Sequence, residues 1–194
     1  LSSLAYNFLG GLIQNAIGMC AITNPTVNSY KRINAPVTAS GATWAPNTIT
    51  YSGNNRTHMI RVPGPGRFEL RLMDGATNPY LLQAGILAAG IDGIEKKRNP
   101  GKPINVNMYE DGHKVKGAKK LPLTLEKSLS HLNKSKVLKD AFSKETIKSY
   151  IKLKNKEIKK YQSSNTKKIG FKGSKQSAKK DIITQWEKDN TLDC

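Results

Sequence analysis

The run Arg67-Phe68-Glu69-Leu70-Arg71 alternates charged and apolar side chains. In a β-strand, successive side chains point to opposite faces, so Arg67, Glu69 and Arg71 are predicted to share one face. The apolar residues would pack into the core from the other face. Carboxylates are ligands for hard divalent cations, and guanidinium groups pair with phosphate or carboxylate oxygens. The segment is therefore a candidate ligand platform, although an amphipathic strand with a solvated ion pair would show the same alternation.

A second strand is predicted to pair with this one. Residues 58–62 have strand-like composition, and Gly64-Pro65-Gly66 is typical of a tight turn. The two strands would form a hairpin with Arg61 on one arm and the charged residues of 67–71 on the other. His58 is predicted to be an ordinary strand side chain.

Helices are predicted around this hairpin from apolar residues at helical spacing and from capping residues. The predicted helices span residues 2–21, 78–93, 121–132, 143–161 and 181–192, the last docking through Ile182, Ile183 and Trp186. Residues 26–56 predict a long loop that contains a strand-like patch, and residues 95–120 predict a surface connection. The fold class is therefore α+β, an antiparallel β-sheet backed by helices.

The net charge of +18 is unevenly distributed along the 194 residues. Residues 1–94 hold six of the 32 lysines and arginines, so the basic bias belongs to the C-terminal half. Lysine-rich stretches at 114–120, 152–160 and 167–180 leave open a basic nucleic-acid-binding protein. Sparse aromatic residues and the lack of a recognition motif make nucleic acid an unfavoured partner. The favoured explanation of the basic residues is solvated helix faces together with a basic low-complexity linker or insert at 162–180. A short helix and tail would follow at 181–194.

The two cysteines, Cys20 and Cys194, cannot form a disulfide framework, which indicates a reducing compartment and a cytoplasmic protein. Cys20 lies in an apolar run and is predicted to be a small core side chain. Residues 1–22 are too polar for a membrane span, so no membrane partner is expected. Because the chain begins at Leu1 within a predicted helix, it is predicted to be a fragment of a longer protein.

Five motifs occur in a fixed order along the chain. They are Asn24-Pro25-Thr26-Val27-Asn28-Ser29-Tyr30-Lys31-Arg32, Asn55-Arg56, Ile60-Arg61-Val62-Pro63, the 67–71 strand and Asn78-Pro79-Tyr80-Leu81. In order and spacing they resemble the C-terminal part of the catalytic domain of glutamine synthetase, which is assigned to residues 1–161. The resemblance implies that ATP phosphorylates the γ-carboxylate of glutamate and that an amine then attacks the acyl phosphate.

The same resemblance implies ATP and Mg²⁺ or Mn²⁺ as cofactors and roles for six side chains. Arg32 and Arg71 would bind glutamate. Arg56, Arg61 and Arg67 would bind ATP, and Arg56 would also be catalytic. Glu69 would bind the metal ion. The other metal-binding glutamates of the family would lie upstream of Leu1, as would the domain that completes a neighbouring subunit's site. A homo-oligomer is therefore expected for the complete protein, and the fragment alone is expected to be inactive.

The chain departs from the well-known bacterial enzymes in its flap. Those enzymes carry a flap glutamate that assists deprotonation of ammonium, whereas no acidic residue precedes Glu69 here. The corresponding Glu-Ala-Pro motif aligns best on Trp44-Ala45-Pro46. This flap resembles the branch labelled type III, which includes γ-glutamylmethylamide synthetases. Trp44 could contact a methylammonium ion through cation–π attraction, or it could be an apolar plug that closes the loop. Methylamine is favoured as the substrate amine, and ammonia is the alternative.

Tyr109 lies where some bacterial relatives carry an adenylylated tyrosine. The residues that follow it, Glu110-Asp111-Gly112-His113, do not match that motif. Tyr109 is therefore predicted to be an ordinary surface tyrosine.

Overall fold

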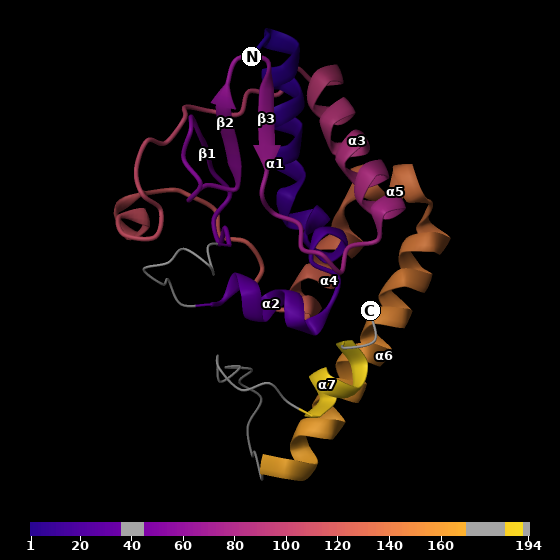
Figure 1. The fold of residues 1–194 in the computed structure, drawn as a ribbon. Helices are drawn as coiled ribbons and strands as arrows, with labels where there is room; N and C mark the ends of the chain where they lie inside the picture. Colours follow the sequence, from indigo (N-terminus) through magenta and orange to yellow (C-terminus); the bar gives the residue numbers. More distant parts are fainter. Residues whose placement is uncertain (36–44, 170–184, 192–194) are drawn as a thin grey trace.

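The computed structural model describes residues 1–35, 45–169 and 185–191, with side chains placed through residue 164 in the second range and through 190 in the third. Within these ranges the chain forms α-helices, one short 3-10 helix and a small three-stranded sheet (Figure 1). The elements are α1 (Ser3–Thr23), α2 (Val27–Ile33), β1 (Tyr51–Ser52), β2 (Ile60–Gly64), β3 (Arg67–Leu70), α3 (Pro79–Glu95), η1 (Gly112–Lys114), α4 (Leu125–Lys134), α5 (Lys136–Phe142), α6 (Lys144–Ile169) and α7 (Gln185–Thr191). The predicted α+β class is confirmed.

The sheet has the order β1-β2-β3 and is mixed rather than wholly antiparallel. β2 and β3 form the predicted antiparallel hairpin, with Arg61 opposite Glu69. β1 pairs with β2 in parallel, in the register Tyr51 to Ile60. The chain loops back between β1 and β2, so the two strands run in the same direction. The Val62 N–H of β2 donates to the carbonyl of Gly53, the residue after β1, at 3.1 Å.

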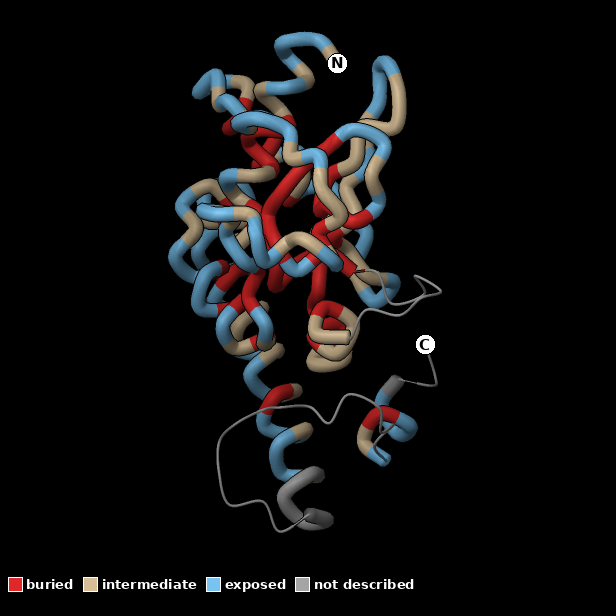
Figure 2. Tube along the Cα trace, turned by 90° about the vertical axis from the view of Figure 1, so that its left-hand side faces the viewer, coloured by how far each residue is buried: buried red, intermediate tan, exposed pale blue. Residues whose placement is uncertain are grey.

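The long helix α1 lies at the centre of the molecule and packs against α3, α4 and α5. Leu9, Leu12 and Met19 of this helix are almost fully buried, and Figure 2 shows buried residues gathered along the middle of the body. Gly11 of α1 and Gly93 of α3 permit the close crossing of these two helices. A Cβ added to Gly11 would lie 2.1 Å from the Ala89 carbonyl oxygen, well inside van der Waals contact.

A buried carboxylate joins α1, α3 and the chain that follows α3. Asp92 is 5% exposed and accepts hydrogen bonds from Arg98 at 2.7 Å, from Asn15 at 3.1 Å and from Lys96. Burial by itself raises the pKa of this carboxyl, but the three hydrogen bonds outweigh it and lower the pKa to about 2. Asp92 is therefore ionised at neutral pH and holds three segments together.

We expect Asp92→Asn to lower the free energy of unfolding at pH 7 by about 2 kcal/mol, because a buried ion-paired carboxylate is lost. Since the folded pKa is depressed, this stabilisation is complete above the ordinary carboxyl pKa of about 4 and is lost as the pH falls toward 2. Urea titrations at several pH values check this. Asp111→Asn, at an exposed pair with Lys114, should leave stability unchanged. A difference between Asp92→Asn and the parent that did not shrink on acidification would contradict the account.

Helix α2 corrects one prediction, because residues 26–56 are not a continuous loop. Thr26 caps the helix: its hydroxyl accepts from the Ser29 N–H, and the Ser29 hydroxyl accepts from the Thr26 N–H. The Val27 N–H donates to Glu157 Oε1 of α6 at 3.1 Å. Seven residues form too short a helix to be stable alone, so its neighbours must hold it. The strand-like patch within the same predicted loop contributes Tyr51 to β1.

Helix α6 continues to Ile169, beyond the predicted end at residue 161, and Figure 1 shows it leaving the body with α7 beside it. The division of the chain at 161 stays a prediction. Trp186 of α7 packs edge-on against the Tyr161 ring, with centroids 5.2 Å apart, whereas Ile182 and Ile183 lie outside the described residues. Among the described helices, none has the length and apolar character required to cross a membrane.

Candidate active site

The β2–β3 hairpin places the predicted charged side chains together on one face. Arg61 Nη1 donates to Glu69 Oε2 at 2.9 Å, and Arg71 Nε lies 3.8 Å from Glu69 Oε1. On the opposite face, Phe68 packs against the Phe8 ring of α1, with centroids 6.1 Å apart. The period-two alternation therefore separates a charged face from a core face, as predicted.

The Glu69 carboxylate is ionised and reachable from solvent. Its side chain is 46% exposed, whereas those of Arg61 and Arg71 are 16% exposed. The hydrogen bond from Arg61 is the main cause that lowers the pKa of Glu69, and the charges of Arg61, Arg71 and Arg56 lower it further, while burial opposes them. Glu69 thus lies within the field of three arginines.

Arg32 joins this cluster from α2. Its Nη2 donates to the carbonyl oxygens of Leu72 at 2.8 Å and Met73 at 2.9 Å, directly after β3. Its Nε is buried and has no hydrogen-bond partner within the described part of the chain. Burial is the main cause that lowers the pKa of Arg32, Asp74 partly offsets it, and the charge of Arg71 lowers it further. Two neighbouring, partly buried guanidinium groups favour an anion between them.

The loop before β2 carries Arg56 and is held by asparagines. Asn55 Oδ1 accepts from the Thr57 N–H at 2.9 Å, and Asn55 Nδ2 donates to the Val106 carbonyl at 3.0 Å. Asn54 Oδ1 accepts from Arg61 Nε at 2.9 Å and also from Nη2 of the same guanidinium. Arg56 itself is exposed, so it can reach a ligand above the charged face.

Of the remaining predicted site residues, Arg67 is exposed next to the hairpin turn, on the same strand face as Glu69. Trp44 lies outside the described residues. In the part of the chain that the structure describes, no group of three or more His, Cys, Asp or Glu side chains could hold a metal ion. A metal site at Glu69 would therefore need further ligands from outside the described residues.

Tyr109 corrects the prediction of a surface tyrosine. The residue is half-buried and its hydroxyl oxygen is fully buried. Burial raises the pKa of Tyr109, and the charges of Arg71 and Arg32 act in the opposite direction, so the ring lies near both guanidinium groups. Asp74 and Asn54 were also missed by the sequence analysis. Asn54 contacts Arg61 only seven residues away, but no motif marks it, whereas Asp74 and Tyr109 act on Arg32 from distant segments of the chain.

Cys20 is a core side chain, as predicted, whereas His58 is buried but lies before β2 rather than within a strand. Cys20 is fully buried, and burial is the main cause that raises its pKa to about 11. His58 is also fully buried, directly before β2, and its ring nitrogens lie 2.9 Å from Thr50 Oγ1 and 3.0 Å from the Val106 carbonyl oxygen. Burial lowers the pKa of His58, which favours the neutral ring.

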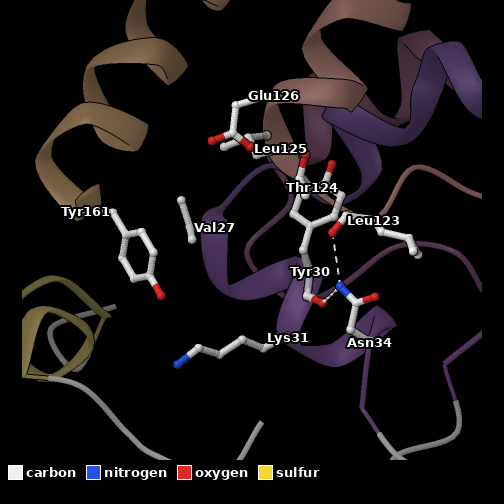
Figure 3. A pocket seen from close by; sticks show the side chains of 9 residues that line it. All are labelled: Val27, Tyr30, Lys31, Asn34, Leu123, Thr124, Leu125, Glu126 and Tyr161. Carbon is white, nitrogen blue, oxygen red and sulfur yellow. Dashed lines mark hydrogen bonds between the residues drawn. The ribbon is translucent and has the colours of Figure 1, made fainter. Parts of the chain in front are cut away.

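A small, partly open pocket lies beside α2 rather than on the charged face (Figure 3). It is lined by Val27, Tyr30, Lys31, Asn34, Leu123, Thr124, Leu125, Glu126 and Tyr161. Its volume is about 30 Å³, which leaves little room for an amino acid or a nucleotide. The charged face is therefore the better candidate for substrate binding.

Comparison with known proteins gives the family. The family described as "Glutamine synthetase, catalytic domain" matches residues 1–170. A glutamine synthetase of Rhizobium meliloti (strain 1021) is 52% identical over 193 residues, covering 100% of this chain and 40% of that protein. A glutamate–methylamine ligase of Methyloversatilis universalis is 44% identical over 160 residues, covering 81% of this chain and 36% of that protein.

A solved structure described as a GmaS/ADP complex superposes with a TM-score of 0.79 at 50% identity, covering 100% of this chain and 40% of that chain. The chain thus spans about 40% of the length of these relatives. The matched fold, the matched sequence and the arginine-rich hairpin agree, and the chain belongs to the glutamine synthetase catalytic domain family.

Proposed function

We propose that the whole protein containing this chain is an ATP-dependent ligase that joins a small amine to the γ-carboxylate of glutamate, with methylamine as the preferred amine. The observation that carries this proposal is the shared charged face, on which the Glu69 carboxylate meets Arg61 and Arg71. The electrostatic influence of Arg71 on Arg32 extends this face to α2. The face thus combines cationic groups for anionic substrates with an oxygen ligand for a divalent cation.

Arg32 and Arg71 bind the glutamate substrate in this proposal. The carbonyl oxygens of Leu72 and Met73 fix the Arg32 guanidinium, while its buried Nε stays available as a donor. Arg71 is largely buried next to Glu69, so its position is also restricted. Two fixed cations can bind a carboxylate with little loss of side-chain freedom.

Arg56, Arg61 and Arg67 bind the phosphates of ATP, and Arg56 stabilises the charge on the transferred phosphoryl group. Phosphoryl transfer depends mainly on positioning and charge neutralisation, which arginines supply. The ionised, half-exposed Glu69 fits Mg²⁺ or Mn²⁺ as one oxygen ligand. A bound divalent ion would neutralise phosphate charge and orient the transferred group.

The reaction has two steps. An oxygen of the glutamate γ-carboxylate attacks the γ-phosphorus of ATP, ADP leaves, and γ-glutamyl phosphate forms. The neutral amine then attacks the γ-carbonyl carbon, a proton is lost from nitrogen, and phosphate leaves with one former carboxylate oxygen. Water must be excluded from the acyl phosphate, because hydrolysis would compete with the amine.

Two observations support methylamine as the preferred amine. The relatives include a protein named glutamate–methylamine ligase and a structure named GmaS. The sequence also lacks any acidic residue before Glu69, where the bacterial flap glutamate is expected. Glutamine synthesis from ammonium is the alternative, and it is favoured by the names of the relatives that are 52% identical.

ADP release by the whole protein with ATP, glutamate and Mg²⁺ tests the proposal, with ammonium and methylammonium compared over a concentration series. We expect kcat/KM to be about tenfold or more higher for methylammonium, since a pocket that fits one extra methyl group gains about this much. A preference for ammonium would select the alternative. The absence of glutamate-dependent ADP release with either amine would overturn the ligase assignment.

We also propose that Leu1–Cys194 alone is inactive and that the whole protein is a homo-oligomer. The described residues supply a single predicted metal ligand, and the chain spans about 40% of the length of the relatives. Further ligands and binding surfaces must come from other parts of the assembly.

A further inference from the structure

Helix α2 carries Arg32 and is held at both ends by the C-terminal half of the chain. At its start, the Val27 N–H donates to Glu157 Oε1 of α6 at 3.1 Å. At its end, Asn34 Nδ2 donates to the Leu123 carbonyl at 3.0 Å, as the dashed line in Figure 3 shows. The position of this short helix therefore depends on elements that are far away in the sequence.

A third attachment comes from α7. Lys31 Nζ pairs with Glu187 Oε1, and Glu187 is only 7% exposed. A buried carboxylate is unfavourable unless a partner compensates its charge, so this contact differs from an ordinary surface ion pair. The edge-on contact between Trp186 and Tyr161 holds α7 against α6 at the same time. Figure 3 shows Lys31 reaching from α2 toward the side on which Tyr161 and the yellow ribbon of α7 lie.

Lys31 and Arg32 are consecutive residues with different directions. Successive side chains of a helix are about 100° apart, so one residue can contact α7 while the next contacts the chain after β3. The observed contacts follow this geometry: Lys31 pairs with Glu187, and Arg32 donates to the Leu72 and Met73 carbonyls. Any rotation or displacement of α2 would move both side chains together.

We propose that Glu187 is a positioning residue for the glutamate-binding site, because its ion pair with Lys31 fixes α2 and thereby the guanidinium of Arg32. This inference rests on the proposed function, in which Arg32 binds glutamate. The match to the catalytic domain family ends at residue 170, so α7 lies outside the matched residues, although the Rhizobium meliloti relative aligns over the whole chain. Substrate affinity would thus be set in part by a segment that the matched domain does not include.

Glu187→Gln in the whole protein tests this proposal. We expect the KM for glutamate to rise about tenfold, because a small displacement of a binding group weakens substrate binding strongly. The KM for ATP and kcat should stay within about twofold, since Arg32 is not expected to contact ATP. If Glu187 acted only through its charge, Glu187→Gln would change the KM for glutamate in the opposite direction. Removing a negative charge would favour binding of the anionic substrate and lower this KM.

The matched control is Asp189→Asn, which removes the same charge from the same helix at an exposed position that contacts Gln185. It should leave the KM for glutamate unchanged. The charge exchange Lys31→Glu with Glu187→Lys should restore the parent KM, and Trp186→Ala should raise it without changing either charge. Thermal unfolding of each variant separates local effects from loss of the fold.

An unchanged or lowered KM for glutamate in Glu187→Gln, or an equal rise in Asp189→Asn, would overturn the positioning role. Arg71→Lys separates this failure from failure of the proposed function. If Arg71→Lys raises the KM for glutamate and Glu187→Gln does not, only the role of α7 is lost. If neither variant changes that KM, the assignment of the glutamate site is also wrong.

Discussion

Glu69→Gln in the whole protein is expected to lower kcat/KM by about 10³, which corresponds to the loss of a group that stabilises transition-state charge. The amide keeps the size of the side chain but removes the charge that faces Arg61 and Arg71. It also removes a predicted ligand of the divalent ion. Because the Glu69 side chain is 46% exposed, the fold should not depend on this carboxylate.

Steady-state kinetics over a series of Mg²⁺ concentrations measure this effect. Binding of Mn²⁺, followed by electron paramagnetic resonance, gives a readout that does not require turnover, and Glu69→Gln should weaken it. Glu145→Gln, in the exposed first turn of α6, is the matched control and should behave like the parent protein. Unchanged turnover in Glu69→Gln would rule out the proposed metal and phosphate site.

Arg71→Lys is expected to raise the KM for glutamate by about 30-fold, since losing a charge-assisted hydrogen bond costs about 2 kcal/mol. Lysine keeps the positive charge but lacks the planar fork that matches a carboxylate. Because Arg71 lies next to Glu69 and influences the pKa of Arg32, it would connect the proposed metal and glutamate parts of the site. Initial rates at varied glutamate and saturating ATP provide the measurement.

Arg56→Lys is the matched comparison for Arg71→Lys. Arg56 is exposed and its charge lowers the pKa of Glu69. The family resemblance assigns it to the transferred phosphoryl group. The same substitution there should lower kcat and leave the KM for glutamate nearly unchanged. Equal effects of the two variants on the KM for glutamate would contradict the separate roles of Arg56 and Arg71.

The hairpin could be predicted from the sequence because its determinants are local. The alternation around Glu69 and the Gly-Pro turn fix which side chains share a face, and the register places Arg61 opposite Glu69. The start of α3 was also predictable, since the Asn78 side chain accepts from the Tyr80 and Leu81 N–H groups. The proposal that these residues share an active site required the family resemblance.

Other parts depend on contacts that no local pattern contains. Helix α2 is capped locally by Thr26, but its first N–H donates to Glu157, which is 130 residues away in the sequence. The pair between Lys31 and Glu187 joins residues separated by 156 positions. Tyr109 was predicted on the surface because the residues that follow it do not match an adenylylation motif, yet the fold places it near Arg32 and Arg71.

The central claim is that the charged face activates the γ-carboxylate of glutamate as an acyl phosphate. Glutamate labelled with ¹⁸O in its γ-carboxylate tests it directly, by mass spectrometry of the inorganic phosphate released with ATP and methylammonium. Transfer of a carboxylate oxygen through γ-glutamyl phosphate predicts one ¹⁸O in each phosphate molecule. Formation of the amide with unlabelled phosphate would contradict the account.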